Sequence, residues 1–174
     1  LFYFNNTNVG TATITITGIG NYTGTRTTTF AITARSIADV TLIPPGDQIY
    51  SGNAFTLKPT VKYGDIVLVE GTDYSLSFFN NVNVGVCSIM VTCKGNYSSS
   101  RITIYNILPK PISSLAITPA PNQVYTGSNI LSEPIVKFGS TTLVKGKDYS
   151  LAYSNNTNVG EAIITINGKG NFGG

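Results

Sequence analysis

Chemically reactive side chains are scarce in this chain. Its 174 residues include no histidine, two cysteines and eight acidic residues that stand singly along the sequence. Acid–base or nucleophilic catalysis needs titratable groups that converge, and a metal site needs clustered carboxylates, imidazoles or thiolates. Neither kind of clustering occurs in the sequence, so we expect no enzyme activity, no metal ion and no cofactor.

The two cysteines, Cys87 and Cys93, fall on what the alternation of residues predicts to be one strand. Six strand steps span about 20 Å, which is far beyond the reach of a disulfide bond. We therefore expect no bond between them. Cys87 takes the place of an alanine found in similar segments of the chain, which predicts an inert, buried thiol acting as a small apolar side chain.

Asparagines offer the other candidate chemistry. Four of them begin N-x-S/T sequons, the acceptor motif for N-linked glycans: Asn5, Asn21, Asn96 and Asn155. Asparagine also tolerates left-handed backbone geometry and bonds to the backbone in turns. Both interpretations stay open, as glycan acceptors or as turn residues. A second pair of alternatives concerns aromatic residues beside Gly-Asn, which either offer a platform for sugars or have a structural role.

An internal repeat of about 75 residues is the most specific signal in the sequence. The hexapeptide NNTNVG at 5–10 returns as NNVNVG at 80–85 and as NNTNVG at 155–160, without insertion or deletion. Further recurring positions are expected to define the structure of each repeat. The expected structural residues are Gly10, Gly20, Tyr22, Asp73, Tyr74, Gly85, Gly95, Tyr97, Asp148, Tyr149, Gly160 and Gly170. Asp73 and Asp148 are expected to cap turns through backbone N–H groups rather than to catalyse.

The phase of the repeat predicts the domain organisation. Residues 1–34 correspond to the C-terminal half of a module, residues 35–109 to a complete module, and residues 110–174 to a module lacking its last strand. The boundaries fall in polar or proline-containing segments at 33–36 and 108–111. Such short, stiff linkers leave little room for free rotation, so we expect a semi-rigid rod of modules.

Within a module the residue pattern predicts an all-β fold, an antiparallel β-sandwich with almost no helix. Expected strands are 25–32, 39–43, 48–50, 57–63, 66–69, 74–78 and 101–107. Alternation predicts one buried face on the strand that follows each NVG turn. The inward-facing residues expected there are Ala12, Ile14 and Ile16, then Cys87, Ile89 and Val91, then Ala162, Ile164 and Ile166.

A family resemblance rests on these motifs together. Asp-Tyr before a strand, Asn-Asn-x-Asn-Val-Gly, an alternating Thr/Ile strand and Gly-x-Gly-Asn-Tyr-x-Gly resemble the bacterial immunoglobulin-like (Ig-like) tandem repeats of large surface proteins. The resemblance covers essentially the whole chain. It implies Ig-like sandwich modules that serve as a stalk, holding another domain away from a cell envelope. Similar modules occur in phage virion proteins, so cell surface and virion surface both stay open as extracellular locations.

These observations favour a structural spacer made of tandem Ig-like repeats. One alternative is an adhesin or glycan-binding module that contacts a surface glycan or protein ligand through its loops. Another is a subunit of a filament or virion appendage, in which residues 25–32 of one copy supply the strand missing from the last repeat of another. The expected partners are therefore neighbouring repeats of the same chain, and a second copy bound head to tail.

Charge and hydropathy exclude two further classes of protein. The 11 basic and 8 acidic residues give a net charge of +3 and form no basic run, so we expect no nucleic-acid binding. No apolar segment approaches the roughly 18 residues that a membrane-spanning helix needs.

Overall fold

The protein is almost entirely β-structure. The computed structural model describes residues 1–174, of which 49% are in strands and 3% in helices. The strands form several sheets, as a β-sandwich architecture requires, and the predicted all-β class is confirmed. By its contacts the chain divides into two compact units. Unit 1 comprises 1–45, 56–79 and 88–104, and unit 2 comprises 46–55, 80–87 and 105–174.

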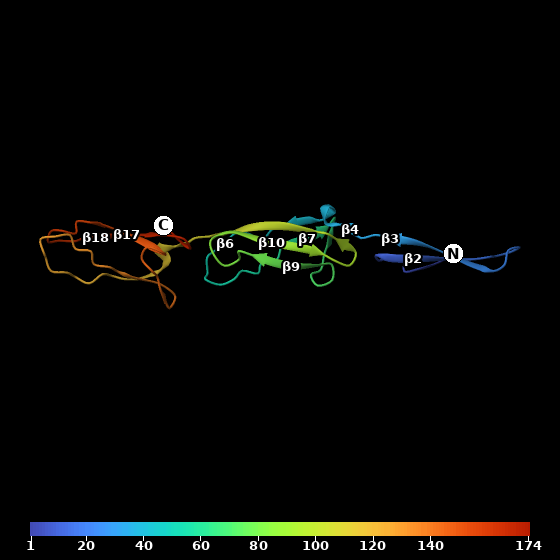
Figure 1. Ribbon diagram of the computed structural model, residues 1–174, viewed down its shortest axis with the longest axis horizontal. Helices are drawn as coiled ribbons and strands as arrows, with labels where there is room; N and C mark the ends of the chain where they lie inside the picture. Colours follow the sequence, from blue (N-terminus) through green and yellow to red (C-terminus); the bar gives the residue numbers. More distant parts are fainter. The chain divides into compact units, whose positions relative to one another are not determined.

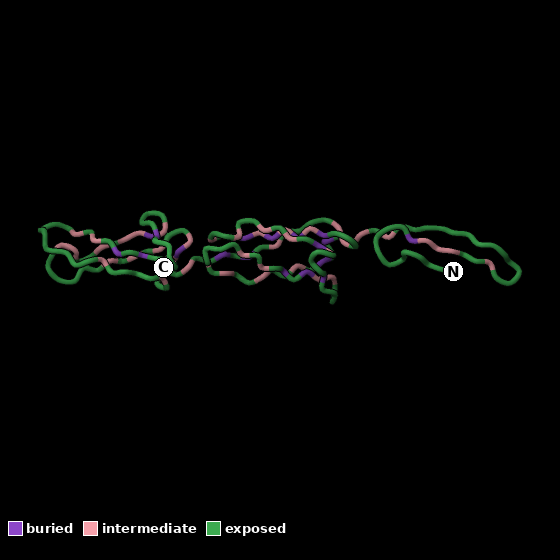
Figure 2. Tube along the Cα trace, turned by 90° about the horizontal axis from the view of Figure 1, so that it is seen from below, coloured by how far each residue is buried: buried purple, intermediate pink, exposed green.

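Unit 1 begins with a three-stranded antiparallel sheet. Its strands are β1 (Phe2–Phe4), β2 (Gly10–Thr17) and β3 (Thr25–Ile32), in the order β1-β2-β3. Ala12 is its only buried residue, Ile14 is half-buried and Ile16 is 46% exposed. The expectation that Ile16 lies in a core is therefore wrong, because no second layer covers this sheet, and Ile14 lies in a core only in part. Figure 2 shows the exposure along residues 1–34.

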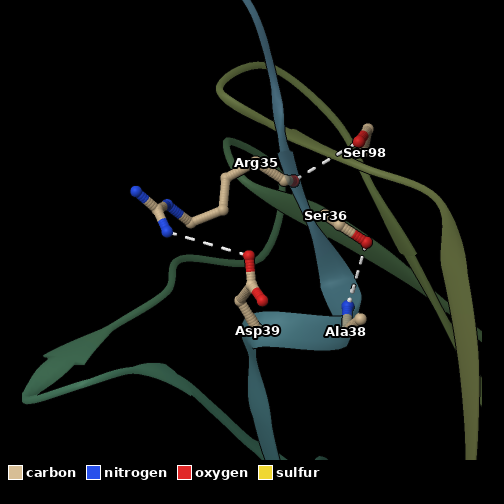
Figure 3. Close-up of polar contacts among 5 residues, drawn as sticks. All are labelled: Arg35, Ser36, Ala38, Asp39 and Ser98. Carbon is tan, nitrogen blue, oxygen red and sulfur yellow. Dashed lines mark hydrogen bonds and ion pairs between the residues drawn. The ribbon is translucent and has the colours of Figure 1, made fainter.

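The next part of unit 1 forms a second small sheet. Its strands are β5 (Thr41–Ile43), β7 (Thr60–Tyr63) and β8 (Ile66–Val67), all antiparallel. The strand expected at 39–43 begins at Thr41 instead, because residues Ile37–Asp39 form a 3-10 helix. Ser36 caps this helix, with its hydroxyl oxygen accepting a 3.2 Å bond from the Ala38 N–H (Figure 3).

A compact apolar cluster lies in the part of unit 1 that follows residue 34. Its buried members are Ile37, Val40, Val61, Leu68, Tyr74, Val91 and Cys93. Leu68 belongs to the cluster although β8 ends at Val67, one residue earlier. The expected strand 66–69 is shorter because the chain leaves the β5-β7-β8 ladder there, and the Val69 N–H bonds a carboxylate. The expected strand 57–63 likewise starts only at Thr60.

A four-stranded sheet lies in the middle of the chain. Its order is β6 (Gln48–Ile49), β12 (Ser100–Leu108), β10 (Gly85–Cys93) and β9 (Tyr74–Phe79), with β12 parallel to β6. Figure 1 labels β6, β10 and β9 of this sheet. On β10 the predicted inward residues Cys87, Ile89 and Val91 are each 0% exposed, which confirms the alternation. Both cysteines are buried, free thiols, and the predicted burial of Cys87 is confirmed.

Unit 2 repeats much of this order. After β13 (Lys110–Pro111) and a 3-10 helix (Ile112–Ser114) come β14 (Ala116–Thr118), β15 (Ile135–Phe138), β16 (Thr141–Thr142), β17 (Tyr149–Ser154), β18 (Ile163–Gly168) and β19 (Phe172–Gly173). Its buried cluster is Ile112, Val136, Leu143, Tyr149 and Phe172. Ala162 is exposed and precedes β18, so its expected place in a core is wrong. Ile164 and Ile166 are half-buried. The structure has no helix with the length and apolarity needed to cross a membrane.

Candidate functional site

The site with the most definite geometry is built from the NNxNVG loops. The first asparagine of each loop adopts a left-handed backbone conformation, with φ of 53° at Asn5, 54° at Asn80 and 55° at Asn155. Asparagine is the non-glycine residue best suited to this geometry. The loop therefore turns sharply at the same place each time and presents its later residues in the same way.

The second asparagine of the loop holds a neighbouring segment of the chain. The Asn81 side-chain N–H donates to the Phe55 carbonyl at 2.8 Å, and the Phe55 N–H donates back to the Asn81 carbonyl at 2.8 Å. Asn156 makes the same pair of bonds with Ile130, at 3.0 and 2.8 Å. These bonds fix each loop to the chain that passes beside it.

The third asparagine of the loop reaches the next repeat. Within unit 1, the side-chain oxygen of Asn96 accepts from the Val9 N–H at 2.8 Å, and its N–H donates to the Asn8 side-chain oxygen at 2.8 Å. The three residues thus form a two-bond bridge between segments 87 and 88 positions apart. We call this arrangement the asparagine bridge.

Unit 2 contains the asparagine bridge again. The side-chain oxygen of Asn171 accepts from the Val84 N–H at 2.9 Å, and its N–H donates to Asn83 at 3.0 Å. Every atom pair corresponds to one in unit 1, one repeat earlier in the sequence. Both asparagines of the bridge recur in the sequence, at 8 and 83 and at 96 and 171. This shared recurrence is a signal of their importance, but it does not say that the two positions contact each other.

The linkers between repeats are hydrogen-bonded rather than free. β4 (Arg35–Ser36) pairs in parallel with β11 (Tyr97–Ser98), and β13 pairs in the same way with β19. The Arg35 N–H donates to the Asn96 carbonyl at 2.9 Å, and the Lys110 N–H donates to the Asn171 carbonyl at 3.0 Å. The bridging asparagine therefore binds both the preceding loop and the linker.

The linker in unit 1 has further polar contacts around Arg35. Its guanidinium lies 4.2 Å from the centre of the Tyr63 ring. The same group lies 3.7 Å from the Asp39 carboxylate, as Figure 3 shows by a dashed line. The Ser98 hydroxyl donates to the Arg35 carbonyl at 3.3 Å. Both charged side chains are about half exposed, so the ion pair contributes little by itself, and the stacking on Tyr63 adds to it.

An aspartate supports the turn beneath each asparagine bridge. The Asp73 carboxylate accepts from the Val69 N–H at 2.8 Å, and the Asp73 carbonyl accepts from the Lys94 N–H at 2.8 Å, next to the Gly-Asn-Tyr turn. Asp148 bonds Val144 and Lys169 in the same way, at 2.8 and 2.9 Å. The expected turn-capping role of the two aspartates therefore agrees with the geometry.

The Gly-Asn-Tyr turn itself depends on its glycine. Gly20, Gly95 and Gly170 have φ of 64°, 65° and 61°, the left-handed region. A Cβ atom at Gly95 would also lie 3.3 Å from the Thr72 carbonyl oxygen. In the loops, Gly10, Gly85 and Gly160 have φ between 133° and 143°.

The aromatic residue of the turn points into the protein where a neighbouring layer exists. Phe172 is 5% exposed and packs with Tyr50 and Phe138, with ring centres 5.6 to 5.8 Å apart. Tyr97 is half-buried against the cluster of unit 1, whereas Tyr22 is 79% exposed. Phe172 offers no free ring face, so the sugar platform considered for these positions does not fit it.

The four sequon asparagines occupy different settings. Asn5 and Asn155 are exposed at the left-handed loop positions, and Asn21 is exposed in the first Gly-Asn-Tyr turn. The Asn96 side-chain nitrogen, the atom to which a glycan would attach, donates its hydrogen bond within the asparagine bridge. A glycan there would have to displace that bond. Glycan attachment at the four residues stays a prediction.

Titratable side chains meet in pairs, such as Tyr105 with Cys87 and Lys58 with Glu70. No group of three or more His, Cys, Asp or Glu side chains has a metal-binding arrangement. Burial raises the pKa of the Cys93 thiol, which makes it a poorer nucleophile. Burial also raises the pKa of Tyr74, Tyr105 and Tyr149.

Comparison with protein-family models, with curated proteins and with solved structures found no match to this chain.

Proposed function

We propose that the chain is a structural spacer, made of tandem Ig-like β-sandwich modules in an extracellular surface protein. The asparagine bridge is the observation that carries the proposal. It occurs at two junctions with the same atoms, both bonds measuring 2.8 Å at the first and 2.9 and 3.0 Å at the second. A spacer keeps its two ends at a defined distance only if consecutive modules keep a fixed orientation. Two side-chain hydrogen bonds together with a paired linker provide that restraint.

The scarcity of reactive groups and the resemblance to bacterial surface repeats support the same proposal. A chain with 11% charged residues and frequent Asn, Ser, Thr and Gly gains its stability from strands and turns rather than from a chemical site. We place the spacer outside the cell, at a cell or virion surface, on the strength of that resemblance.

Removal of the asparagine bridge tests the proposal. In Asn96→Ala, the Val9 N–H and the Asn8 side chain lose their partner, so residues 1–34 should reorient faster than residues 35–99 in ¹⁵N relaxation measurements. In the wild-type chain the two segments should share one correlation time. Small-angle scattering should indicate an elongated particle for the wild type and a broader range of particle dimensions for the variant.

Asn106→Ala is the matched control. Asn106 bonds Asp47 through its backbone N–H at 2.7 Å and through its side chain at 3.2 Å, within a single repeat. Its replacement should lower stability without changing the relative motion of the segments. A compact wild-type particle, or unequal correlation times in the wild type, would contradict the spacer.

A further inference from the structure

An ion pair occurs at the same place in two repeats, with its charges reversed. In the middle repeat the Lys58 ammonium lies 2.7 Å from the Glu70 carboxylate. In the last repeat the Lys145 ammonium bonds the Glu133 carboxylate. Glu133 corresponds to Lys58 and Lys145 corresponds to Glu70, one repeat later in the sequence. The ion pair is thus retained, while the sign of the charge at each position is reversed.

The backbone holds these side chains in the same way in both repeats. Glu70 precedes a turn in which the Gly71 N–H donates to the Tyr74 carbonyl at 2.8 Å. The turn after Lys145 is closed by the same bond, at 2.7 Å. In the other segment, a proline follows the charged residue in both repeats. The two sites therefore share one geometry and differ in the sign of their charges.

Stability does not require this reversal. The side chains of Lys58 and Glu70 are 66% and 35% exposed, and those of Lys145 and Glu133 are 46% and 48% exposed. Exposed ion pairs contribute little to the free energy of folding, and either polarity would give the same attraction. The reversal matters only where one repeat meets a segment of the other, because attraction then becomes repulsion.

The other contacts of the two repeats discriminate little between them. Four residues of each buried cluster are identical: Ile37 and Ile112, Val61 and Val136, Leu68 and Leu143, and Tyr74 and Tyr149. Asn81 and Asn156 also bond the chain beside them through the same atoms. Repeats that are this similar are prone to exchange equivalent segments during folding.

We infer that the reversed ion pair makes each repeat fold with its own N-terminal segment rather than with that of its neighbour. The two segments are residues 35–63 and 110–138, which end at the turns after β7 and β15. In an exchanged chain, these turns open and each segment lies in the other repeat. Each segment carries one charged residue of its ion pair, and the other charged residue stays behind.

Exchange turns two attractions into two repulsions. Lys58 would lie beside Lys145, and Glu133 would lie beside Glu70. Selectivity of this kind arises from repulsion in the wrong arrangement as much as from attraction in the right one. If both repeats had the same polarity, an exchanged chain would keep two attractive pairs and would carry no such penalty.

Single-molecule refolding of the full 174-residue chain measures the exchange. Donor and acceptor dyes are placed on Ala54→Cys and Val82→Cys, two exposed positions. They adjoin Phe55 and Asn81, which bond each other, so a correctly folded chain gives high energy transfer and an exchanged chain gives low energy transfer. Both natural cysteines are buried in the folded chain and stay unlabelled. At picomolar concentration, exchange between two copies does not contribute.

Two double variants give both repeats the same polarity. Lys58→Glu/Glu70→Lys reverses the ion pair of the middle repeat, and Glu133→Lys/Lys145→Glu reverses that of the last repeat. Each variant retains an ion pair in both repeats, so its urea midpoint should match that of the wild type. The fraction of exchanged chains after refolding should rise by about fivefold or more in both variants, the combined scale of two lost exposed ion pairs and two like-charge contacts.

The quadruple variant, which combines the four substitutions, is the matched control. It restores opposite polarity, so its exchanged fraction should return to that of the wild type. Raising the salt concentration should increase exchange in the wild type but not in the double variants, because salt screens the repulsion between exposed charges.

A carbodiimide, which joins an amine to a carboxylate in contact with it, identifies the exchanged chains. After refolding of Lys58→Glu/Glu70→Lys, peptide mapping should find a link between positions 58 and 145. In the wild type, links should join only Lys58 to Glu70 and Lys145 to Glu133. Equal exchanged fractions in the wild type and the double variants, including none in any of them, would overturn the inference. An exchanged fraction that stays high in the quadruple variant would overturn it as well.

Discussion

Asparagine has three different roles in one loop of this protein. Asn80 supplies a left-handed backbone conformation, Asn81 binds the chain beside the loop, and Asn83 completes the asparagine bridge. Only the first role follows from the intrinsic preference of the residue. The other two depend on which segments the fold brings near, which is why the sequence predicted a turn but not its partners.

Tyr105 is a buried residue with a polar group that the fold does not satisfy. Its hydroxyl is buried beside the Cys87 thiol and makes no hydrogen bond of ordinary geometry, which costs the folded state desolvation energy. Tyr105→Phe removes that hydroxyl and retains the ring, and phenylalanine is the residue found at the corresponding position 30. We expect the free energy of unfolding to rise by about 1 kcal/mol, measured by urea denaturation.

Tyr153→Phe provides the comparison for that prediction. The Tyr153 hydroxyl donates to the Ser132 carbonyl at 3.2 Å, so the same chemical change removes a hydrogen bond. Stability should fall by about 0.5–1.5 kcal/mol. A Tyr105→Phe chain that is less stable than the wild type would show that the hydroxyl has a partner after all.

Burial of tyrosines also sets the response to alkaline pH. The pKa values of Tyr74, Tyr105 and Tyr149 are raised in the folded chain above the ordinary value of 10.0, chiefly by burial. A raised pKa in the folded state means that the unfolded state releases its proton first. The stabilisation is therefore complete below about pH 10 and is lost as the pH rises further. Between pH 8 and 11, the midpoint temperature of thermal unfolding should first stay constant and then fall. A midpoint temperature that stays constant over this whole range would contradict the prediction.

At the scale of elements, each turn is held by one carboxylate. Asp73→Ala leaves the Val69 N–H without its acceptor and loosens the turn that positions Lys94. We expect a loss of about 1–2 kcal/mol in the free energy of unfolding, the range measured for lost capping groups. Asp65→Ala, at an exposed position in the turn between β7 and β8, should change stability by less than about 0.5 kcal/mol. Equal effects of the two substitutions would rule out the capping role.

The elements also show how far the sequence could predict the fold. Residues 25–32 match β3 at both ends, because their partner is the adjacent strand and the pairing is local. The start of the strand expected at 39–43 is wrong, because Ser36 caps a 3-10 helix over Ile37–Asp39. An alternating pattern of apolar and polar residues does not predict such a helix. The predicted burial of one face of β2, and of the segment around Ala162, is wrong for another reason. Alternation says which side chains share a face, but not whether a second layer covers it.

At the scale of the whole molecule, two separate apolar clusters form, one in each unit. Four members of each cluster correspond one repeat apart in the sequence, among them Ile37 and Ile112, and Tyr74 and Tyr149. The residues of the asparagine bridge also recur one repeat apart, although the contacts between them were not predicted from the sequence. Recurrence in the sequence thus predicted which positions matter, whereas the contacts between repeats required the folded backbone.

The predicted module boundaries lead to a test on fragments. Residues 35–109 include every buried residue of the unit 1 cluster, together with β6 and β12, so this fragment should unfold in one cooperative transition. A domain of this size buries only about 60% of its chain surface, so its stability should be marginal.

Shortening that fragment to residues 35–99 should expose one particular thiol. The cut removes β12, the neighbour of β10 in the sheet, and with it the buried Tyr105. Cys87 is 0% exposed in the full chain and lies on β10, so it should become reactive, whereas Cys93 belongs to a cluster that the cut leaves intact. Labelling with a maleimide followed by peptide mapping should therefore modify Cys87 at least about tenfold faster in the shorter fragment. Equal labelling of Cys87 in the two fragments would mean that β12 does not cover this thiol, which would contradict the prediction.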